Sequence, residues 1–159
     1  MIKKLFKTLF CLVILLSFSN CGFKVVDQNY FKNYQINEVV TNGDKRISYL
    51  LKNKLRSSKE SSASLKNIKL VIKINKQRSI KEKNLQNQIT KYKIIITTSV
   101  NYEIEDYKSG NFIINEQGDY SVADRYTLTL NNEKKLLKLM TVNIEEKITN
   151  NLRLVLDDI

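Results

Sequence analysis

The 159-residue sequence has no histidine, proline or tryptophan, and only four glycines and two cysteines. Without histidine there is no imidazole for general-base catalysis, for a nucleophilic triad or for a metal site. The chain also lacks a GxSxG elbow, a P-loop and a glycine-rich dinucleotide turn. We therefore predict a protein that is not an enzyme, with no catalytic residue, no metal and no cofactor.

The acidic residues leave one enzymatic alternative, a hydrolase that uses a pair of carboxylates. Most of these acids are scattered near the predicted strand ends and turns, where a carboxylate is ordinarily solvated. They include Glu103, Glu105, Asp106, Glu116, Asp119 and Asp124. This distribution favours the prediction of a non-enzyme.

The start of the chain is typical of an export signal. Three lysines and no acid occur in the first seven residues, and an apolar run at 9–16 leads to a small polar stretch that ends at Cys21. The apolar run is about half the roughly 20 residues that are needed to span a bilayer. Residues 1–20 are therefore predicted to be a cleaved signal and not a membrane span.

The cysteine at the expected cleavage point makes this signal similar to that of a bacterial lipoprotein. The similarity implies that Cys21 carries covalent lipid, which is the only prosthetic group expected, and that 21–33 is a lipidated tether. Gly22 stands where Asp is associated with retention in the inner membrane, so the outer membrane is favoured. Cys11 leaves with the signal, and no internal disulfide is then possible. A plain secretory signal with an incidental cysteine is the alternative.

Positive charge dominates the remainder of the chain. The 27 basic residues include three in the signal, so 24 basic and 16 acidic residues leave a formal charge of +8. Such an excess favours polyanionic partners, which are nucleic acid, anionic lipid headgroups or phosphorylated glycolipid. Export argues against nucleic acid.

Hydrophobic periodicity predicts one α+β domain over residues 34–159. Alternating residues predict strands, and apolar residues spaced by three or four predict helices. The expected order is β-α-β-β-β-α, a sandwich with two helices packed on one face of a four-stranded sheet. The expected elements are a strand at 34–40, a helix at 44–55, strands at 68–75, 91–105 and 111–126 (the last with a bulge at Gly118), and a closing helix capped by Asn131 or Asn132.

Lysines occupy the face of the second and third strands that points away from the predicted core. This set comprises Lys69, Lys73, Lys91 and Lys93, and Arg78 lies in the predicted loop at 76–87 that joins the strands. Like charges on paired strands repel each other, so an anionic ligand would explain the pattern. The alternative is a solvated, aggregation-resistant face.

Several short stretches, in this order, resemble the lipopolysaccharide-assembly lipoprotein family LptE. They are Cys21-Gly22-Phe23, the helical segment at 47–55, the strand segment at 98–104 and Gly118-Asp119-Tyr120-Ser121, followed by the closing helix. The resemblance spans essentially the whole chain after the signal. Each stretch alone is a weak indication, and their order carries the resemblance.

The resemblance implies an outer-membrane lipoprotein on the periplasmic side, which plugs and helps to assemble the LptD β-barrel. It also implies a part in lipopolysaccharide transport and direct binding of lipopolysaccharide by basic residues. The candidates on the sheet are Lys69, Lys73, Arg78, Lys91 and Lys93, and Lys134 and Lys135 lie near the last helix. The alternative function is that of a lipoprotein auxiliary in another envelope transport complex.

Overall fold

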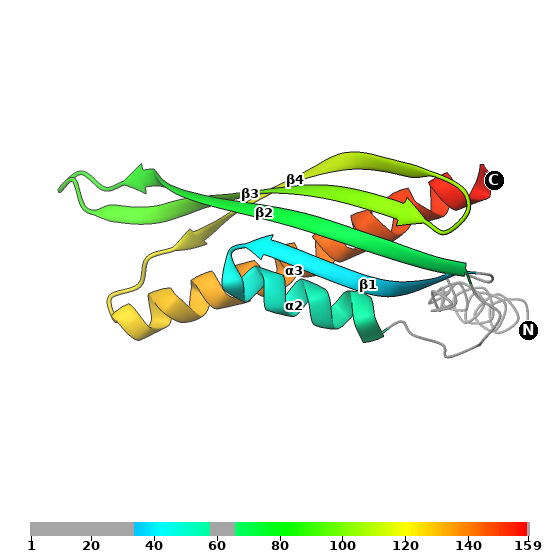
Figure 1. Ribbon diagram of the computed structural model, residues 1–159. Coiled ribbons are helices and arrows are strands. Elements are labelled where there is room, and N and C mark those ends of the chain that lie inside the picture. The colour runs from blue at the N-terminus through cyan, green and yellow to red at the C-terminus, as the bar shows by residue number, and fades with distance from the viewer. Residues whose placement is uncertain (1–33, 58–65, 159) are drawn as a thin grey trace, which may run out of the picture.

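The computed structural model describes residues 34–57 and 66–158, which form six elements in the predicted order (Figure 1). They are β1 (Tyr34–Gly43), α2 (Lys45–Ser57), β2 (Lys66–Lys83), β3 (Ile89–Ile104), β4 (Ser109–Ser121) and α3 (Tyr126–Asp157). The predicted signal and the tether with Cys21 lie outside the described residues.

The four strands form one mixed sheet in the order β1-β2-β3-β4. β1 pairs with β2 in parallel, while β2, β3 and β4 form an antiparallel meander. A parallel pair requires a crossover connection, and the chain segment that contains α2 supplies it. Both helices lie on the same side of the sheet (Figure 1), which confirms the predicted α+β sandwich.

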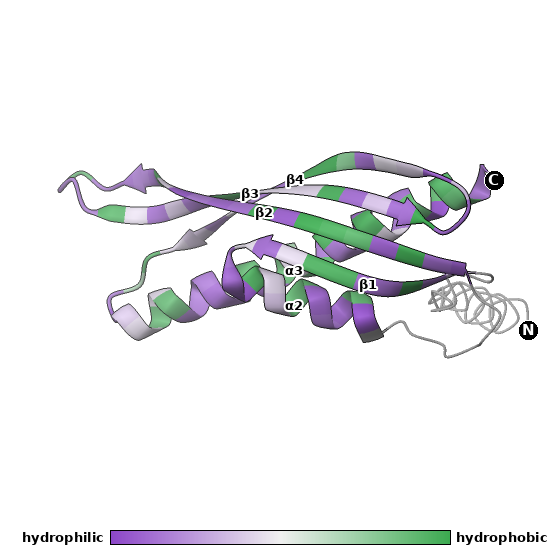
Figure 2. Ribbon diagram, in the orientation of Figure 1, coloured by the Kyte–Doolittle hydropathy of each residue, from purple (hydrophilic) through white to green (hydrophobic). Residues whose placement is uncertain are grey.

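The core forms where the apolar faces of the strands and the helices meet. Alternate residues of β2 and β3 are fully buried, and Figure 2 shows hydrophobic and hydrophilic residues alternating along β2. Each such buried aliphatic side chain contributes roughly 1.5–3 kcal/mol. The helices supply Ile47, Leu51 and Leu55 from α2 and Leu137, Met140, Ile144, Ile148 and Leu152 from α3.

The predicted loop at 76–87 is wrong, because β2 continues through Lys83 before it turns. The polar residues of 76–83 have low intrinsic strand propensity, but they pair with the start of β3, which is rich in strand-forming residues. This pairing continues up to Lys83 opposite Ile89. Strand propensity depends on such pairing more than on the isolated residue. The true turn is short, and the Asn84 side chain accepts hydrogen bonds from the amides of Gln86 and Gln88.

The closing helix begins at Tyr126, before the predicted caps at Asn131 and Asn132. Arg125 occupies the N-cap position without a side-chain cap, and the Thr129 hydroxyl instead exchanges hydrogen bonds with the backbone of Ala123. This local bond holds the first turn in place of a capping asparagine. Asn132, inside the helix, donates to the Ser121 carbonyl at 3.0 Å and ties α3 to β4.

Gly118 is not a bulge, because the pairing of β3 with β4 is continuous from Lys91–Ser121 to Glu103–Ser109. A β-carbon at Gly118 would lie 2.6 Å from a terminal methyl of Leu136 on α3. The glycine therefore allows the helix to approach the strand closely, which is the other common reason for a glycine within a strand.

Thr98 provides a stability prediction, because its buried hydroxyl has no hydrogen-bond partner. Thr98→Val keeps the branched shape and removes the unsatisfied group, so we expect it to raise the free energy of unfolding by about 1 kcal/mol. Thr141→Val is the matched control, because the buried Thr141 hydroxyl donates to the Leu137 carbonyl at 2.7 Å. Urea denaturation should show a gain for Thr98→Val alone, and equal behaviour of the two variants would contradict the expectation.

Asp44 caps α2 and provides a second prediction. Its carboxylate accepts from the amides of Arg46 and Ile47 at 3.1 and 3.0 Å and pairs with Lys76 at 3.0 Å. Partial burial raises the pKa of Asp44, but these hydrogen bonds and the Lys76 charge outweigh it and hold the pKa below its ordinary value. Asp44→Ala should cost about 1–2 kcal/mol of stability. Asp44→Asn, which keeps a capping oxygen, should cost less.

The lowered pKa of Asp44 also determines how the contribution of this residue to stability depends on pH. The stabilisation by ionised Asp44 is present above its ordinary pKa of about 4 and is lost as pH falls through the lower pKa of the folded state. The stability difference between the parent and Asp44→Asn should therefore shrink on acidification. A difference that stays constant in denaturation curves down to pH 2 would contradict the assignment.

Candidate anion-binding surface

The β2–β3 hairpin extends past the rest of the sheet at one end of the molecule (Figure 1). β1 ends opposite Ile74, so beyond this point β2 is paired only with β3. We call residues 76–94 the distal hairpin and the opposite end of the molecule, where β1 and β2 begin, the proximal end. The distal hairpin carries six basic residues and one acid, a formal charge of +5: Lys76, Arg78, Lys81, Lys83, Lys91 and Lys93 against Glu82.

Arg78 lies on the helix side of the distal hairpin, above two stacked tyrosines. Its guanidinium carbon is 4.9 Å from the centroid of the Tyr92 ring, which stacks on Tyr120 at 5.5 Å between centroids. Hydrogen bonding to Tyr120 is the main cause that raises the pKa of Arg78 above its ordinary value. An arginine over an aromatic face is held in place while its edge remains free for a phosphate or carboxylate.

The lysines of the distal hairpin differ in whether they have an acidic partner. Lys91 pairs with Glu82 at 2.9 Å, and Lys81 pairs with Asp119 of β4. Lys93 has no carboxylate partner within ion-pair distance among residues 34–57 and 66–158, and Lys83 donates only to the amide oxygen of Asn87. The surface thus retains positive charge that its own acids do not neutralise.

The structure does not bring the five predicted sheet residues together on one face. Arg78 falls on the helix side, because the even-numbered residues of β2 face the helices and are the buried ones. Lys93 lies opposite Ser79, which is ten residues from Lys69 and six from Lys73. At about 3.3 Å per residue these separations are about 33 and 20 Å. Only Arg78, Lys91 and Lys93 belong to the distal hairpin.

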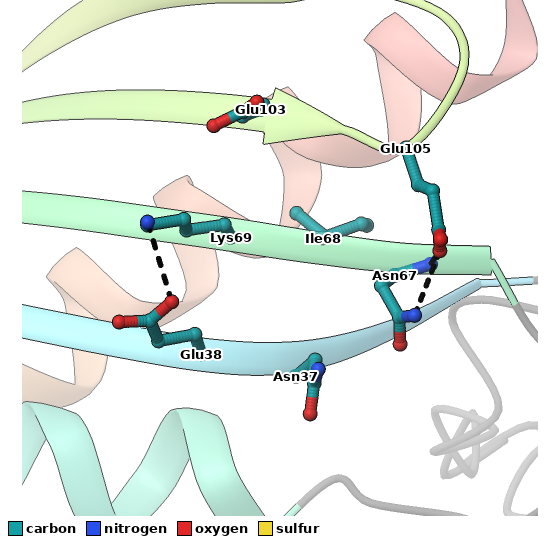
Figure 3. A pocket seen from close by; sticks show the side chains of 7 residues that line it. All are labelled: Asn37, Glu38, Asn67, Ile68, Lys69, Glu103 and Glu105. Carbon is teal, nitrogen blue, oxygen red and sulfur yellow. Dashed lines mark hydrogen bonds and ion pairs between the residues drawn. The ribbon is translucent and has the colours of Figure 1, made fainter.

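Lys69 lies near the proximal end, in acidic surroundings. It lies opposite Glu103 and pairs with Glu38 at 3.4 Å. These residues line a shallow hollow of about 290 Å³ together with Glu105 (Figure 3). Glu105 accepts a hydrogen bond from the side-chain amide of Asn67 at 2.7 Å. Anions are disfavoured here, so the molecule is basic at the distal end and more acidic at the proximal end.

The tyrosine platform under Arg78 is the part of this surface that the sequence pattern missed. The alternation along β3 assigns Tyr92 to the core side, and the structure places it half-buried at the edge of the core. Treating residues 76–83 as a strand would have put Arg78 on the same side as Tyr92. Both residues are even-numbered, as are the buried residues of their strands, so the sequence pattern could have placed them on the same side.

Within the described ranges, no cluster of three or more His, Cys, Asp or Glu is placed to hold a metal ion. Among the described helices, none is long and apolar enough to cross a membrane.

The arrangement of strands and helices is that of several solved bacterial lipoproteins. Rare lipoprotein B from Shewanella oneidensis superposes with a TM-score of 0.57 at 15% identity, over 77% of this chain and 98% of that one. A Caulobacter crescentus structure named as a lipoprotein gives a TM-score of 0.57 at 17% identity, over 76% and 90% of the two chains.

A third structure, a minor lipoprotein from Acinetobacter baumannii, gives a TM-score of 0.50 at 13% identity, over 76% of this chain and 92% of that one. By sequence, no family model and no curated protein matches the chain. At these identities the structural similarity establishes the fold, which is shared over nearly the full length of the solved lipoproteins.

Proposed function

We propose that this chain is an LptE-type lipoprotein of the outer membrane that binds lipopolysaccharide and takes part in its transport to the cell surface. Lipid on Cys21 anchors it on the periplasmic side, and its partner is a large β-barrel of the LptD type, which it plugs and helps to assemble. Its role is in binding and assembly and not in catalysis, and it needs no cofactor beyond the lipid.

The observation that carries this proposal is the distal hairpin. Its formal charge of +5, with Arg78 fixed on Tyr92, suits the phosphates and acidic sugars of lipopolysaccharide. The lipoprotein-like signal and the fold shared with solved lipoproteins support the same function.

The open face of the sheet supports the barrel partner. Neutral polar residues alternate with the buried ones along the middle of β3. Two of them face asparagines of β4, in the pairs Thr97–Asn115 and Asn101–Asn111, and Ser99 between them faces the exposed Ile113. The interior of a large outer-membrane barrel is polar, so this face suits contact with a lumen.

Affinity purification of the tagged protein from detergent-solubilised outer membrane, followed by mass spectrometry, tests the partner. We expect a large β-barrel protein in near-equimolar amount. Recovery of an inner-membrane ATPase complex would instead support an auxiliary of another transport system. Recovery of no partner would leave an anion-binding lipoprotein and would contradict the barrel assignment.

A further inference from the structure

A polar contact ties the distal hairpin to the helix layer at the point where the hairpin leaves the rest of the sheet. The last residue of β1 that pairs with β2 is Gly43, opposite Ile74. Lys76, two residues further along β2, lies between two carboxylates, 3.0 Å from Asp44 at the start of α2 and 3.9 Å from Glu133 of α3. The base of the hairpin is thus connected to both helices.

Glu133 is a mostly buried acid beside a basic surface, with 17% of its side chain exposed. One of its carboxylate oxygens faces Lys76, and the other accepts a hydrogen bond from the hydroxyl of Tyr120 at 3.5 Å. Burying a carboxylate costs free energy unless charges and hydrogen bonds compensate for it. Both contacts of Glu133 are long, so the stability of the fold gives only a weak reason for an acid at this position.

The hydroxyl of Tyr120 joins Glu133 to Arg78. A phenol hydroxyl has one hydrogen to donate and lone pairs that accept. Because the hydrogen of Tyr120 is directed to Glu133, its oxygen is left to accept a hydrogen bond from the guanidinium of Arg78. Hydrogen bonds in such a chain polarise and strengthen one another. The negative charge of Glu133 also attracts Arg78 directly, so the carboxylate acts on the arginine in two ways.

Tyr120 also belongs to the platform on which Arg78 rests. It stacks on Tyr92, with 5.5 Å between the ring centroids, and the guanidinium carbon of Arg78 lies 4.9 Å from the centroid of Tyr92. Arg78 follows Lys76 by two residues, so both side chains leave β2 on the same side. Glu133 therefore meets the hairpin at two neighbouring side chains of one face, directly at Lys76 and through Tyr120 at Arg78.

From these contacts we propose that Glu133 is a positioning residue for anion binding by the distal hairpin. Through the hydroxyl of Tyr120 it holds the guanidinium of Arg78 against the tyrosine rings, and through Lys76 it holds the base of the hairpin against α3. Glu133 does not itself contact the ligand. The inference rests on the lipopolysaccharide binding proposed above, and it gives an acidic residue a favourable role in binding an anion. Net charge alone predicts the opposite, since loss of an acid makes the surface more positive.

The sign of the change in affinity tests the role of Glu133. Fluorescent lipopolysaccharide is titrated against the full chain with Cys21→Ser, which cannot be acylated at residue 21. Glu133→Met keeps a long, helix-forming side chain and removes both acceptor oxygens. We expect binding to weaken by about threefold to tenfold, the range that corresponds to one lost hydrogen bond. Tighter or unchanged binding would overturn the inference.

Two further variants lose the same negative charge and serve as matched controls. Glu133→Gln keeps an oxygen that accepts from Tyr120, so it should bind lipopolysaccharide about threefold more tightly than Glu133→Met. Glu82→Met removes an exposed acid of the hairpin and should tighten binding, because Lys91 is then released from its ion pair. Equal affinities of the two Glu133 variants would overturn the inference. A loss in Glu82→Met as large as that in Glu133→Met would also overturn it.

Tyr120→Phe tests the connection between Glu133 and Arg78 without any change of charge. It keeps the ring that stacks on Tyr92 and removes only the hydroxyl, so we expect lipopolysaccharide binding to weaken by about threefold or more. Tyr126→Phe is the control, because this ring at the start of α3 is 74% exposed. It should change the affinity by less than about twofold. Binding by Tyr120→Phe as tight as that of the parent would overturn the inference.

Nuclear magnetic resonance measures the position of Arg78 without any ligand. The sequence has five arginines, and the ring current of Tyr92 should shift the Nε–H signal of Arg78 upfield of the other four. Arg78→Lys identifies the signal. The shift should persist in Glu133→Gln and be lost in Glu133→Met, and a shift that Glu133→Met retains would overturn the inference. Failure of the parent to bind lipopolysaccharide would overturn the proposed function, and this spectrum would still decide whether Glu133 positions Arg78.

Discussion

Removing three charges from the distal hairpin is expected to weaken lipopolysaccharide binding by about tenfold to a hundredfold. The variant combines Arg78→Gln, Lys91→Gln and Lys93→Gln. Arg78 contributes most because Tyr92 and Tyr120 hold it in place, and Lys93 has no acidic partner within the described parts of the chain. Lys91 already forms an ion pair with Glu82, so the loss of Lys91 alone should weaken lipopolysaccharide binding less. Titration with fluorescent lipopolysaccharide measures the change.

The matched control removes three charges elsewhere. It combines Lys69→Gln, Lys73→Gln and Lys108→Gln, and we expect a change of less than threefold because Lys69 lies among acids near the proximal end. Raising the salt concentration to 1 M shortens the screening length to about 3 Å and should reduce the difference between the variants. Equal losses in both variants would show that the ligand senses only the net charge.

Replacing Gly43 by alanine is expected to cost about 3 kcal/mol or more of stability. Gly43 has a φ of +113°, which side chains rarely tolerate, and a β-carbon there would lie 1.9 Å from the carbonyl oxygen of Ile74. That oxygen is backbone within the β1–β2 pairing and cannot rotate away. The change would displace the end of β1 and the adjacent start of α2, and thermal or urea unfolding would measure the loss.

Gly118→Ala is the control for Gly43→Ala. A β-carbon at Gly118 also meets a close atom, at 2.6 Å, but that atom is a terminal methyl of Leu136 and can move. We expect a cost of about 1–2 kcal/mol, typical of a tight core position. A loss at Gly118 as large as that at Gly43 would show that backbone conformation is not the deciding factor.

The order of elements could be predicted from sequence because the spacing of apolar side chains shows directly which face of a strand or helix is buried. Ile68, Leu70, Ile72 and Ile74 alternate as one face of a strand must, and the apolar spacing from Leu137 to Leu152 fits one face of a helix. Both patterns depend only on the residues of one element. The same residues are therefore buried in the folded structure. The prediction of two helices on one face of four strands was confirmed.

The extent of the distal hairpin and the composition of the basic site could not be obtained in the same way. Residues 76–83 are strand because of their partners in β3, which local propensity does not contain. Grouping the lysines needed the pairing register, and a register that places Lys93 opposite Ser79 separates it from Lys69 by most of β2. The contacts of Glu133 likewise depend on how α3 packs against β2 and β4.

The parallel pairing of β1 with β2 also has a mechanical consequence. β1 starts at the proximal end (Figure 1), and nine of its residues pair with β2. A pull on the chain that precedes Tyr34, directed away from the domain along the strand axis, acts across the ladder of hydrogen bonds. All the bonds then share the load in shear and do not open one after another. An anchor at that end of the chain would therefore pull on the sheet in its most resistant direction.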